Sequence, residues 1–449
     1  MTSQQAPKQR SKRMRVALPI PVLTLSLAAA GLTGACTSQA ADRSQAPASA
    51  SGTTARTITT GTAGTATGGA TRTASSSAPA SATSRAATTA TSSAAKNAAT
   101  TCVDKVYGGM TAAQRVGQLF MGSVTPSKPS QQQIQLMRQY HVGSVFLAGR
   151  STAGTTATRT LVNSLQAKAD TVAGRRLPLL VSTDQEGGQV QVLSGPGFST
   201  MPSALVQGSW STSYLRNAAT TWGKQLKSAG VNLNLAPVAD VVPAALGRNN
   251  APIGRYDREF GHTAATVTPH SNAFAAGMAQ AKVLATLKHF PGLGNVRGNT
   301  DTTANVVDSV TTTTSSSLEP FRSGIKAGAP FVMISSAIYS KIDAKHQAVF
   351  SSTVIQGMLR KNMGFKGVVI SDDIGRAVAV KAVSPGNRAV NFLSAGGDVV
   401  LTVDPSLIPA MTTAVQNRMA QSSAFRTQVS QSVHRVLTAK QQEGLLTCG

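Results

Sequence analysis

The feature that most constrains the fold of this chain is a regular alternation, from Cys102 onward, of short apolar runs with segments of helical periodicity. Seven runs are continuous and rich in Val, Leu and Ile, a pattern typical of strands buried on both faces. They are residues 142–149, 177–188, 230–241, 282–292, 330–340, 364–373 and 396–404. Helical segments between consecutive strands predict parallel strands that are covered by helices.

The number and order of these strands favour a TIM-type (β/α)8 barrel in a single catalytic domain. An eighth strand is expected in a weaker segment near residues 252–262, and residues 110–124 have the spacing of a helix. A doubly wound open sheet is the main alternative. Polar residues follow nearly every predicted strand, whereas an open sheet would concentrate them at one switch point, so the barrel is preferred.

Acidic residues are scarce in this part of the chain, and several of them fall where the predicted strands end. These residues are Asp184, Glu186, Asp240, Asp372, Asp373 and Asp404, with Asp301 on a loop after another strand. Solvated strand ends are the simplest explanation. Together with Arg258, Lys288 and His289, however, these carboxylates would line a pocket suited to hydroxyl groups, and paired carboxylates in such a pocket indicate glycoside hydrolysis.

The sequence gives no indication of a cofactor. It has no Cys/His cluster with zinc spacing, no phosphate-binding glycine loop and no nucleophile elbow, so neither a metal nor an organic cofactor is expected. The chain has a net charge of +25, and the part from Cys102 onward retains +16, because ten basic residues and one acidic residue precede it. Nucleic acid is a poor candidate partner, since aromatic residues are few and no basic recognition helix is present.

The first 101 residues differ from the rest in composition. Residues 1–36 combine a basic start with an apolar stretch and small residues before Cys36, which predicts a signal peptide, with a transmembrane anchor as the alternative. The segment LTGAC resembles a bacterial lipobox, so lipidation of Cys36 and tethering to the cell envelope are expected. Residues 37–101 are almost wholly Ala, Thr, Ser and Gly and are predicted to be a disordered linker before the folded unit 102–449.

Export also bears on the cysteines. If Cys36 carries lipid, Cys102 and Cys448 remain at the two ends of the folded unit. An even pair in an oxidising compartment predicts a disulfide, and two free thiols are the alternative.

Five motifs resemble, in order, those of family 3 glycoside hydrolases: DQEGGQVQ, NLNLAPVADV, IGRYDREFG, KHFPGLG and GVVISDDIG. They are most similar to the single-barrel branch of bacterial β-N-acetylhexosaminidases, over nearly all of residues 105–405. The resemblance implies that Asp372 is the nucleophile of a retaining mechanism. It also implies that Asp184, Arg258, Lys288 and His289 are ligands of the sugar hydroxyl groups.

The chain departs from the family pattern in the loop after KHFPGLG. There the family has an Asp-x-His dyad as its acid/base, and ungapped counting puts Asn299 and Asp301 at those two positions. We therefore expect Asp301 to be the proton donor, with a simple loop-capping role as the alternative. The basic residues that follow DQEGG in the family are replaced by Gln189 and Val192, so the motifs leave recognition of the leaving group undefined.

These observations predict an exported retaining β-N-acetylglucosaminidase, acting on N-acetylglucosamine-containing fragments of the cell wall (muropeptides) or of chitin. The alternatives within the class are a β-glucosidase and a glycoside phosphorylase of the same family. The alternative outside the class is a non-catalytic sugar-binding envelope lipoprotein.

Overall fold

The computed structural model describes residues 102–446. The predictions for residues 1–36 and 37–101, including lipidation of Cys36, concern residues outside this range. Cys448 also lies outside it. Cys102 is buried in the helix that spans residues 102–109, and its pairing with Cys448 remains a prediction. Within 102–446, no helix combines the length and the apolarity that crossing a bilayer requires.

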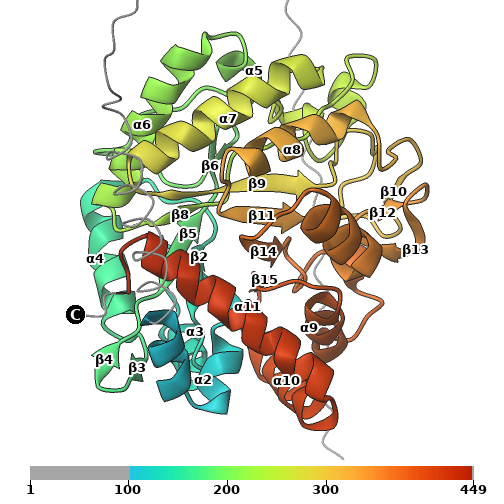
Figure 1. Cartoon of the computed structure of the whole chain (residues 1–449). Helices are drawn as coiled ribbons and strands as arrows, with labels where there is room; N and C mark the ends of the chain where they lie inside the picture. Colours follow the sequence, from blue (N-terminus) through green and yellow to red (C-terminus); the bar gives the residue numbers. More distant parts are fainter. Residues whose placement is uncertain (1–101, 447–449) are drawn as a thin grey trace, which may run out of the picture. The chain divides into compact units, whose positions relative to one another are not determined.

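Eight parallel strands form a barrel, which confirms the predicted fold (Figure 1). In chain order they are β1 (Phe120–Val124), β2 (Ser144–Leu147), β5 (Leu180–Thr183), β8 (Leu233–Asn234), β9 (Leu284–Phe290), β11 (Phe331–Ile334), β14 (Val368–Ser371) and β15 (Val400–Thr402). Consecutive strands are hydrogen-bonded, and β1 also pairs with β15. A bridge between Ile370 and Val399 joins β14 to the start of β15, so the open-sheet alternative is excluded.

All seven predicted strands are present, but the expected position of the eighth is wrong. Residues 110–124 are not one helix: α2 (Ala112–Gly117) ends early and β1 follows. Every residue of β1 is buried, and a Cβ on Gly122 would lie 2.4 Å from the Met137 sulfur, so this strand packs tightly under its neighbouring helix. Residues 252–262 contain only the 3-10 turn η2 (Gly254–Tyr256) and loop.

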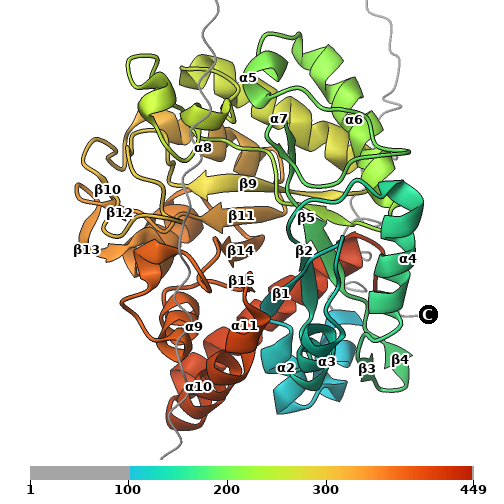
Figure 2. The ribbon, with the colours of Figure 1, turned by 180° about the vertical axis from the view of Figure 1, so that it is seen from behind.

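Helices surround the barrel, as Figures 1 and 2 show from opposite sides. They are α3 (Gln131–Gln139), α4 (Gly154–Gln166), α5 (Ala204–Gln207), α6 (Thr212–Ser228), α7 (Ala264–Gln280), α8 (Glu319–Lys326), η5 (Thr353–Asn362), α9 (Pro385–Ser394), α10 (Ile408–Gln421) and α11 (Ser423–Gln442). Several begin at a hydroxyl cap, for example Ser211, Thr263 and Ser422, whose side chains accept a backbone N–H of the first turn. Their apolar faces cover the outer surface of the strands.

Two small sheets extend the chain beyond the carboxyl ends of the strands. One is the hairpin of β6 (Gln185–Gly187) and β7 (Val190–Gln191), which directly follows β5. The other comprises β10 (Val307–Asp308), β12 (Ile338–Tyr339) and β13 (Asp343–Gln347). These additions build the rim of the barrel at the end where enzymes of this fold place their active sites.

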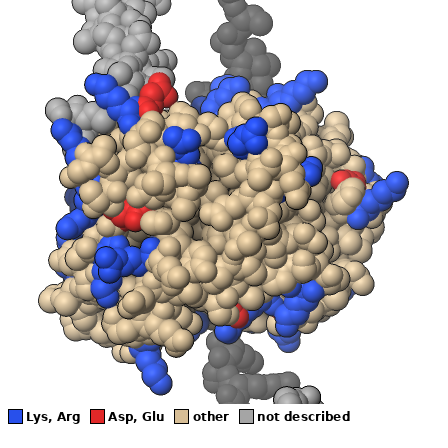
Figure 3. Space-filling view, turned by 90° about the horizontal axis from the view of Figure 1, so that it is seen from below, with Lys and Arg blue, Asp and Glu red and all other residues tan. Residues whose placement is uncertain are grey.

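The described part of the chain has a strongly basic surface. Figure 3 shows one face, on which Lys and Arg side chains clearly outnumber Asp and Glu. Many of the acidic residues are instead buried: Glu186, Asp240, Glu259, Asp308 and Asp398 are each at most 4 % exposed. About a third of these scarce carboxylates therefore lie inside the fold.

Candidate active site

A pocket of about 350 Å³ lies at the carboxyl ends of the strands. Its polar lining consists of Asp184, Arg258, Lys288, His289, Asn299, Thr300, Asp301, Asp372, Asp373 and Arg376. All six residues predicted to bind or transform the sugar are in this set. They come from segments far apart in the sequence, which the closed barrel brings to one mouth.

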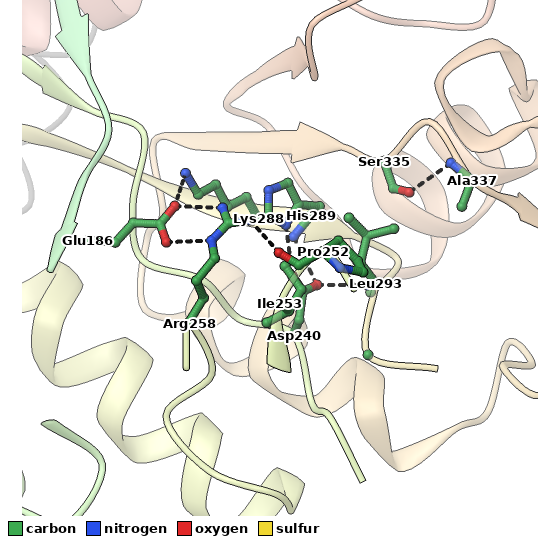
Figure 4. A network of polar contacts seen from close by, with 12 residues as sticks. Glu186, Asp240, Pro252, Ile253, Arg258, Lys288, His289, Leu293, Ser335 and Ala337 are labelled. Atoms are coloured by element: carbon green, nitrogen blue, oxygen red, sulfur yellow. Dashed lines mark hydrogen bonds and ion pairs between the residues drawn. The ribbon is translucent and has the colours of Figure 1, made fainter. Parts of the chain in front are cut away.

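A buried carboxylate, Glu186, lies at one end of the polar network, where it contacts two cations (Figure 4). Its two oxygens accept from Nε and Nη2 of Arg258, at 2.8 and 2.7 Å, in a bidentate fork. The Lys288 ammonium lies 2.5 Å from Glu186 and 2.7 Å from Asp184. The negative charges of two carboxylates therefore balance the positive charges of two cations at the base of the pocket.

These charges determine one another's protonation. Burial alone would raise the pKa of Glu186, but the charges of Arg258 and Lys288 outweigh it and hold the pKa at about 2. Burial also opposes the charge on Lys288, yet Asp184 and Glu186 raise its pKa above the usual value. Glu186 and Lys288 are thus charged at neutral pH, and Lys288 and the half-buried Arg258 remain hydrogen-bond donors.

The local sequence explains how Glu186 and Arg258 reach this position. Gly187 and Gly188 both have positive φ in the turn of the β6–β7 hairpin, and a Cβ on Gly187 would lie 2.1 Å from the Pro202 carbonyl oxygen. The buried Asn250 amide donates to the carbonyls of Leu293, Gly294 and Val296, and its oxygen accepts from two N–H groups of the next turn. The segment that carries Arg258 is thereby fastened to the loop after β9.

Asp240 orients His289. One oxygen of the fully buried Asp240 carboxylate lies 2.7 Å from Nδ1 of His289, and the other accepts from the backbone N–H groups of His289 and Leu293. A proton on Nδ1 leaves Nε2 of His289 available to the pocket. Asp240 is therefore a positioning residue as well as a structural one.

The adjacent aspartates at the end of β14 have different surroundings. The Asp373 carboxylate accepts three backbone N–H groups, from Gly375, Arg376 and Val403, at 2.9 to 3.0 Å. It therefore holds the loops after β14 and β15 together. The Asp372 carboxylate accepts from the N–H of Asp373 and lines the pocket, so it is the member of the pair with acceptor capacity left for a substrate.

Asp301 lies on the loop after β9 and lines the same pocket as Asp372. Its own N–H bonds to the Asn299 side chain, and two backbone hydrogen bonds join the loop to residues after β14: Val378 N–H to Asp301 O, and Ala379 N–H to Thr300 O. Although the residue is exposed, desolvation of the carboxyl group, followed by the negative charge of Asp372, raises the pKa of Asp301 to about 6.

One important residue was expected only to be among the carboxylates that line the pocket, and it lies behind that lining instead. Glu186 was recognised as an acidic residue at a strand end, but only the structure makes it the partner of Arg258 and Lys288. Its position two residues after Asp184, on the same side of an extended segment, was the available signal. Asp404, from the same group of acids, lies outside this pocket and 3.5 Å from Arg376. Among residues 102–446, no group of His, Cys, Asp and Glu could hold a metal ion.

Comparisons with known proteins agree with this geometry. Residues 111–439 match the model of the glycosyl hydrolase family 3 N-terminal domain. A β-hexosaminidase of Xylella fastidiosa is 36 % identical over 308 residues, which cover 66 % of this chain and 86 % of that protein. The chain therefore belongs to glycosyl hydrolase family 3 and is a glycoside hydrolase.

Solved structures support the same assignment. A β-N-acetylhexosaminidase of Beutenbergia cavernae is 48 % identical with a TM-score of 0.73, covering 74 % of this chain and 99 % of that one. A family 3 β-N-acetylglucosaminidase of a Paenibacillus species is 29 % identical with a TM-score of 0.68, covering 76 % of this chain and 64 % of that one.

The network predicts a large effect for Glu186→Gln. The substitution removes the charge that lies between the buried Lys288 and the half-buried Arg258, and breaking a buried pair typically costs about 3–5 kcal/mol. We expect a comparable loss in the free energy of unfolding, measured by urea denaturation. Glu319→Gln, which removes an exposed carboxylate from the first turn of α8, is the control and should cost less than about 1 kcal/mol. Equal losses in the two variants would contradict the central place given to Glu186.

Proposed function

We propose that this protein is a retaining β-N-acetylhexosaminidase that releases terminal N-acetylglucosamine. The observation that carries the proposal is one pocket in which two unlike carboxyl groups, Asp372 and Asp301, share the lining with a cluster of hydrogen-bonding groups. The relatives are named β-hexosaminidase and β-N-acetylhexosaminidase, which supports the choice of sugar.

The two carboxyl groups divide the reaction between them. The Asp372 carboxylate attacks the anomeric carbon and forms a covalent glycosyl-enzyme, while Asp301 gives its proton to the departing glycosidic oxygen. In the second step a water molecule attacks the same carbon while Asp301 takes a proton from it. This attack breaks the bond between the sugar and Asp372, so the sugar is released, Asp372 is again a carboxylate and Asp301 is again protonated. A pKa of about 6 suits both duties, because the group can hold a proton at first and accept one later.

The remaining polar residues bind the sugar. Asp184 and His289 offer acceptor or donor atoms to its hydroxyl groups, and Arg258 and Lys288 offer fixed donors. Because Glu186 and Asp240 already hold three of these side chains in place, little side-chain freedom is lost when the sugar binds. Preorganised side chains of this kind can stabilise the transition state as well as bind the substrate in its ground state.

The natural substrates in this proposal are N-acetylglucosamine-containing fragments of the cell wall or of chitin, and the protein acts outside the cytoplasm. A signal-like segment before Cys36 and the basic folded unit support a location at an anionic cell envelope.

Asp372→Ala should lose at least about three powers of ten in kcat on an aryl N-acetyl-β-glucosaminide, because no glycosyl-enzyme can form. Asp104→Ala, an exposed position in helix 102–109, is the control and should keep full activity. Assaying the matching aryl β-glucoside tests the sugar preference. If Asp372→Ala keeps more than about a tenth of the rate, the nucleophile assignment is wrong, and faster glucoside hydrolysis would instead favour a β-glucosidase.

Asp301→Asn should slow substrates with poor leaving groups by roughly 10²–10⁴-fold, since these require protonation of the glycosidic oxygen. With an activated aryl glycoside the intermediate should form and then stall, and added azide should release it. For a poor leaving group, kcat/KM of the wild type should fall as the pH rises through about 6, as Asp301 loses its proton. That descending limb should be absent in Asp301→Asn. If Asp301 only caps the loop, Asp301→Asn should slow all substrates alike or none of them, azide should have no effect, and the pH profile should be unchanged.

Lipidation of Cys36 can be tested in the producing bacterium. Mass spectrometry of the protein from the membrane fraction should show an acylated N-terminal cysteine, and Cys36→Ser should move the protein to the medium. A mature protein without lipid, or one cleaved elsewhere, would contradict the tethering proposal while leaving the enzymatic one untouched.

A further inference from the structure

A second hollow adjoins the catalytic pocket on one side. It is lined by Asp301, Gly375, Arg376, Val378, Lys381, Pro385, Arg388, Asp404 and Leu407, which we call the Arg376–Lys381 groove. It shares Asp301 and Arg376 with the catalytic pocket, but it contains none of the proposed sugar ligands and not Asp372. The groove therefore begins where the proposed proton donor lies and leads away from the sugar.

This arrangement gives the groove a place in the proposed reaction. In a retaining glycosidase the nucleophile and the acid flank the scissile bond, and the acid lies beside the oxygen of the leaving group. The leaving group must therefore lie on the Asp301 side of the pocket. The Arg376–Lys381 groove includes Asp301 in its lining and contains none of the proposed sugar ligands, which is the position that a leaving-group subsite requires.

The charges of the groove are unequal. Arg376 has a partial partner in Asp404 at 3.5 Å, but Asp404 also bonds to Ser406. Lys381 is exposed, and no ion pair to it occurs among the residues that the structure describes. Arg388 is only 5 % exposed and gives its guanidinium hydrogens to the backbone carbonyls of Val383, Ile374 and Gly375. The accessible cations of the groove are therefore Arg376 and Lys381, while Pro385 and Leu407 supply an apolar wall.

We propose that the Arg376–Lys381 groove is the leaving-group subsite and that it favours leaving groups that carry a carboxylate. The inference rests on the proposed glycosidase function and adds a specificity that neither the motifs nor the relatives define. Lys381 is its principal specificity residue, because its ammonium is free to pair with an anion. A carboxylate there would replace water on an exposed cation, an interaction of modest strength.

The groove is also connected to the proton donor. Two backbone hydrogen bonds, from Val378 N–H to Asp301 O at 3.1 Å and from Ala379 N–H to Thr300 O at 3.0 Å, join its wall to the acid's loop. A leaving group seated against residues 376–381 therefore contacts the same unit that carries Asp301. Recognition in the groove should consequently appear in kcat/KM and not merely as an additional binding event.

The test compares two substrates with leaving groups of similar reactivity, the 4-(carboxymethyl)phenyl and 4-methylphenyl N-acetyl-β-glucosaminides. We expect the wild type to favour the carboxylate-bearing substrate in kcat/KM by roughly two- to fivefold, and we expect Lys381→Gln to bring the ratio close to one. High salt should reduce the ratio in the wild type, because the cations are exposed. Lys361→Gln, which removes an exposed lysine on η5 outside the groove, should keep the wild-type ratio.

Three other results would each contradict a particular part of this proposal. A wild-type ratio near one that Lys381→Gln leaves unchanged overturns the specificity but not the glycosidase function. An equal fall of the ratio in Lys361→Gln overturns the groove, because the general basic charge of the protein would then explain the preference. Failure of the wild type to hydrolyse either substrate overturns the proposed function, and this inference with it.

Discussion

The site depends on one buried carboxylate, Glu186, held between two cations, the buried Lys288 and the half-buried Arg258. Removing charges from water is costly, and the arrangement is stable only because Arg258 meets Glu186 in a bidentate fork and Lys288 reaches both Glu186 and Asp184. The same contacts join the hairpin after β5, the loop before Arg258 and strand β9. A charge requirement thus fixes the geometry of three segments at the barrel mouth.

The second constraint is the separation of roles between carboxyl groups. Glu186 is held charged by its cations, and Asp373 is occupied by three backbone N–H groups. Asp301 lies on a solvent-facing loop, where desolvation and the charge of Asp372 favour its protonated form. Two structural carboxylates therefore leave Asp372 and Asp301 available for chemistry, the pairing that a retaining glycosidase requires.

The barrel could be predicted from the sequence because seven of its strands are continuous apolar runs. Such runs are typical of parallel strands that are buried on both faces. The eighth strand was misplaced, since Leu119, Phe120 and Met121 follow α2 with a spacing that also suits a helix, and only tertiary packing distinguishes the two. The residues at the strand ends were predictable from strand direction and from family motifs. The ion pairs of Glu186 and the attachment of the Asp301 loop to residues 378–379 were not, because both join segments that are distant in the chain.

The claim that Asp372 is the nucleophile in a pocket completed by Asp301 can be tested most directly by locating the covalent intermediate. The Asp301→Asn variant, mixed with an activated aryl N-acetyl-β-glucosaminide, is acid-quenched, digested and sequenced by tandem mass spectrometry. The account predicts one N-acetylglucosamine attached to Asp372, with fragment ions that exclude Asp373. A sugar attached to Asp373 or to another residue, or continued turnover with no attached sugar, would contradict it.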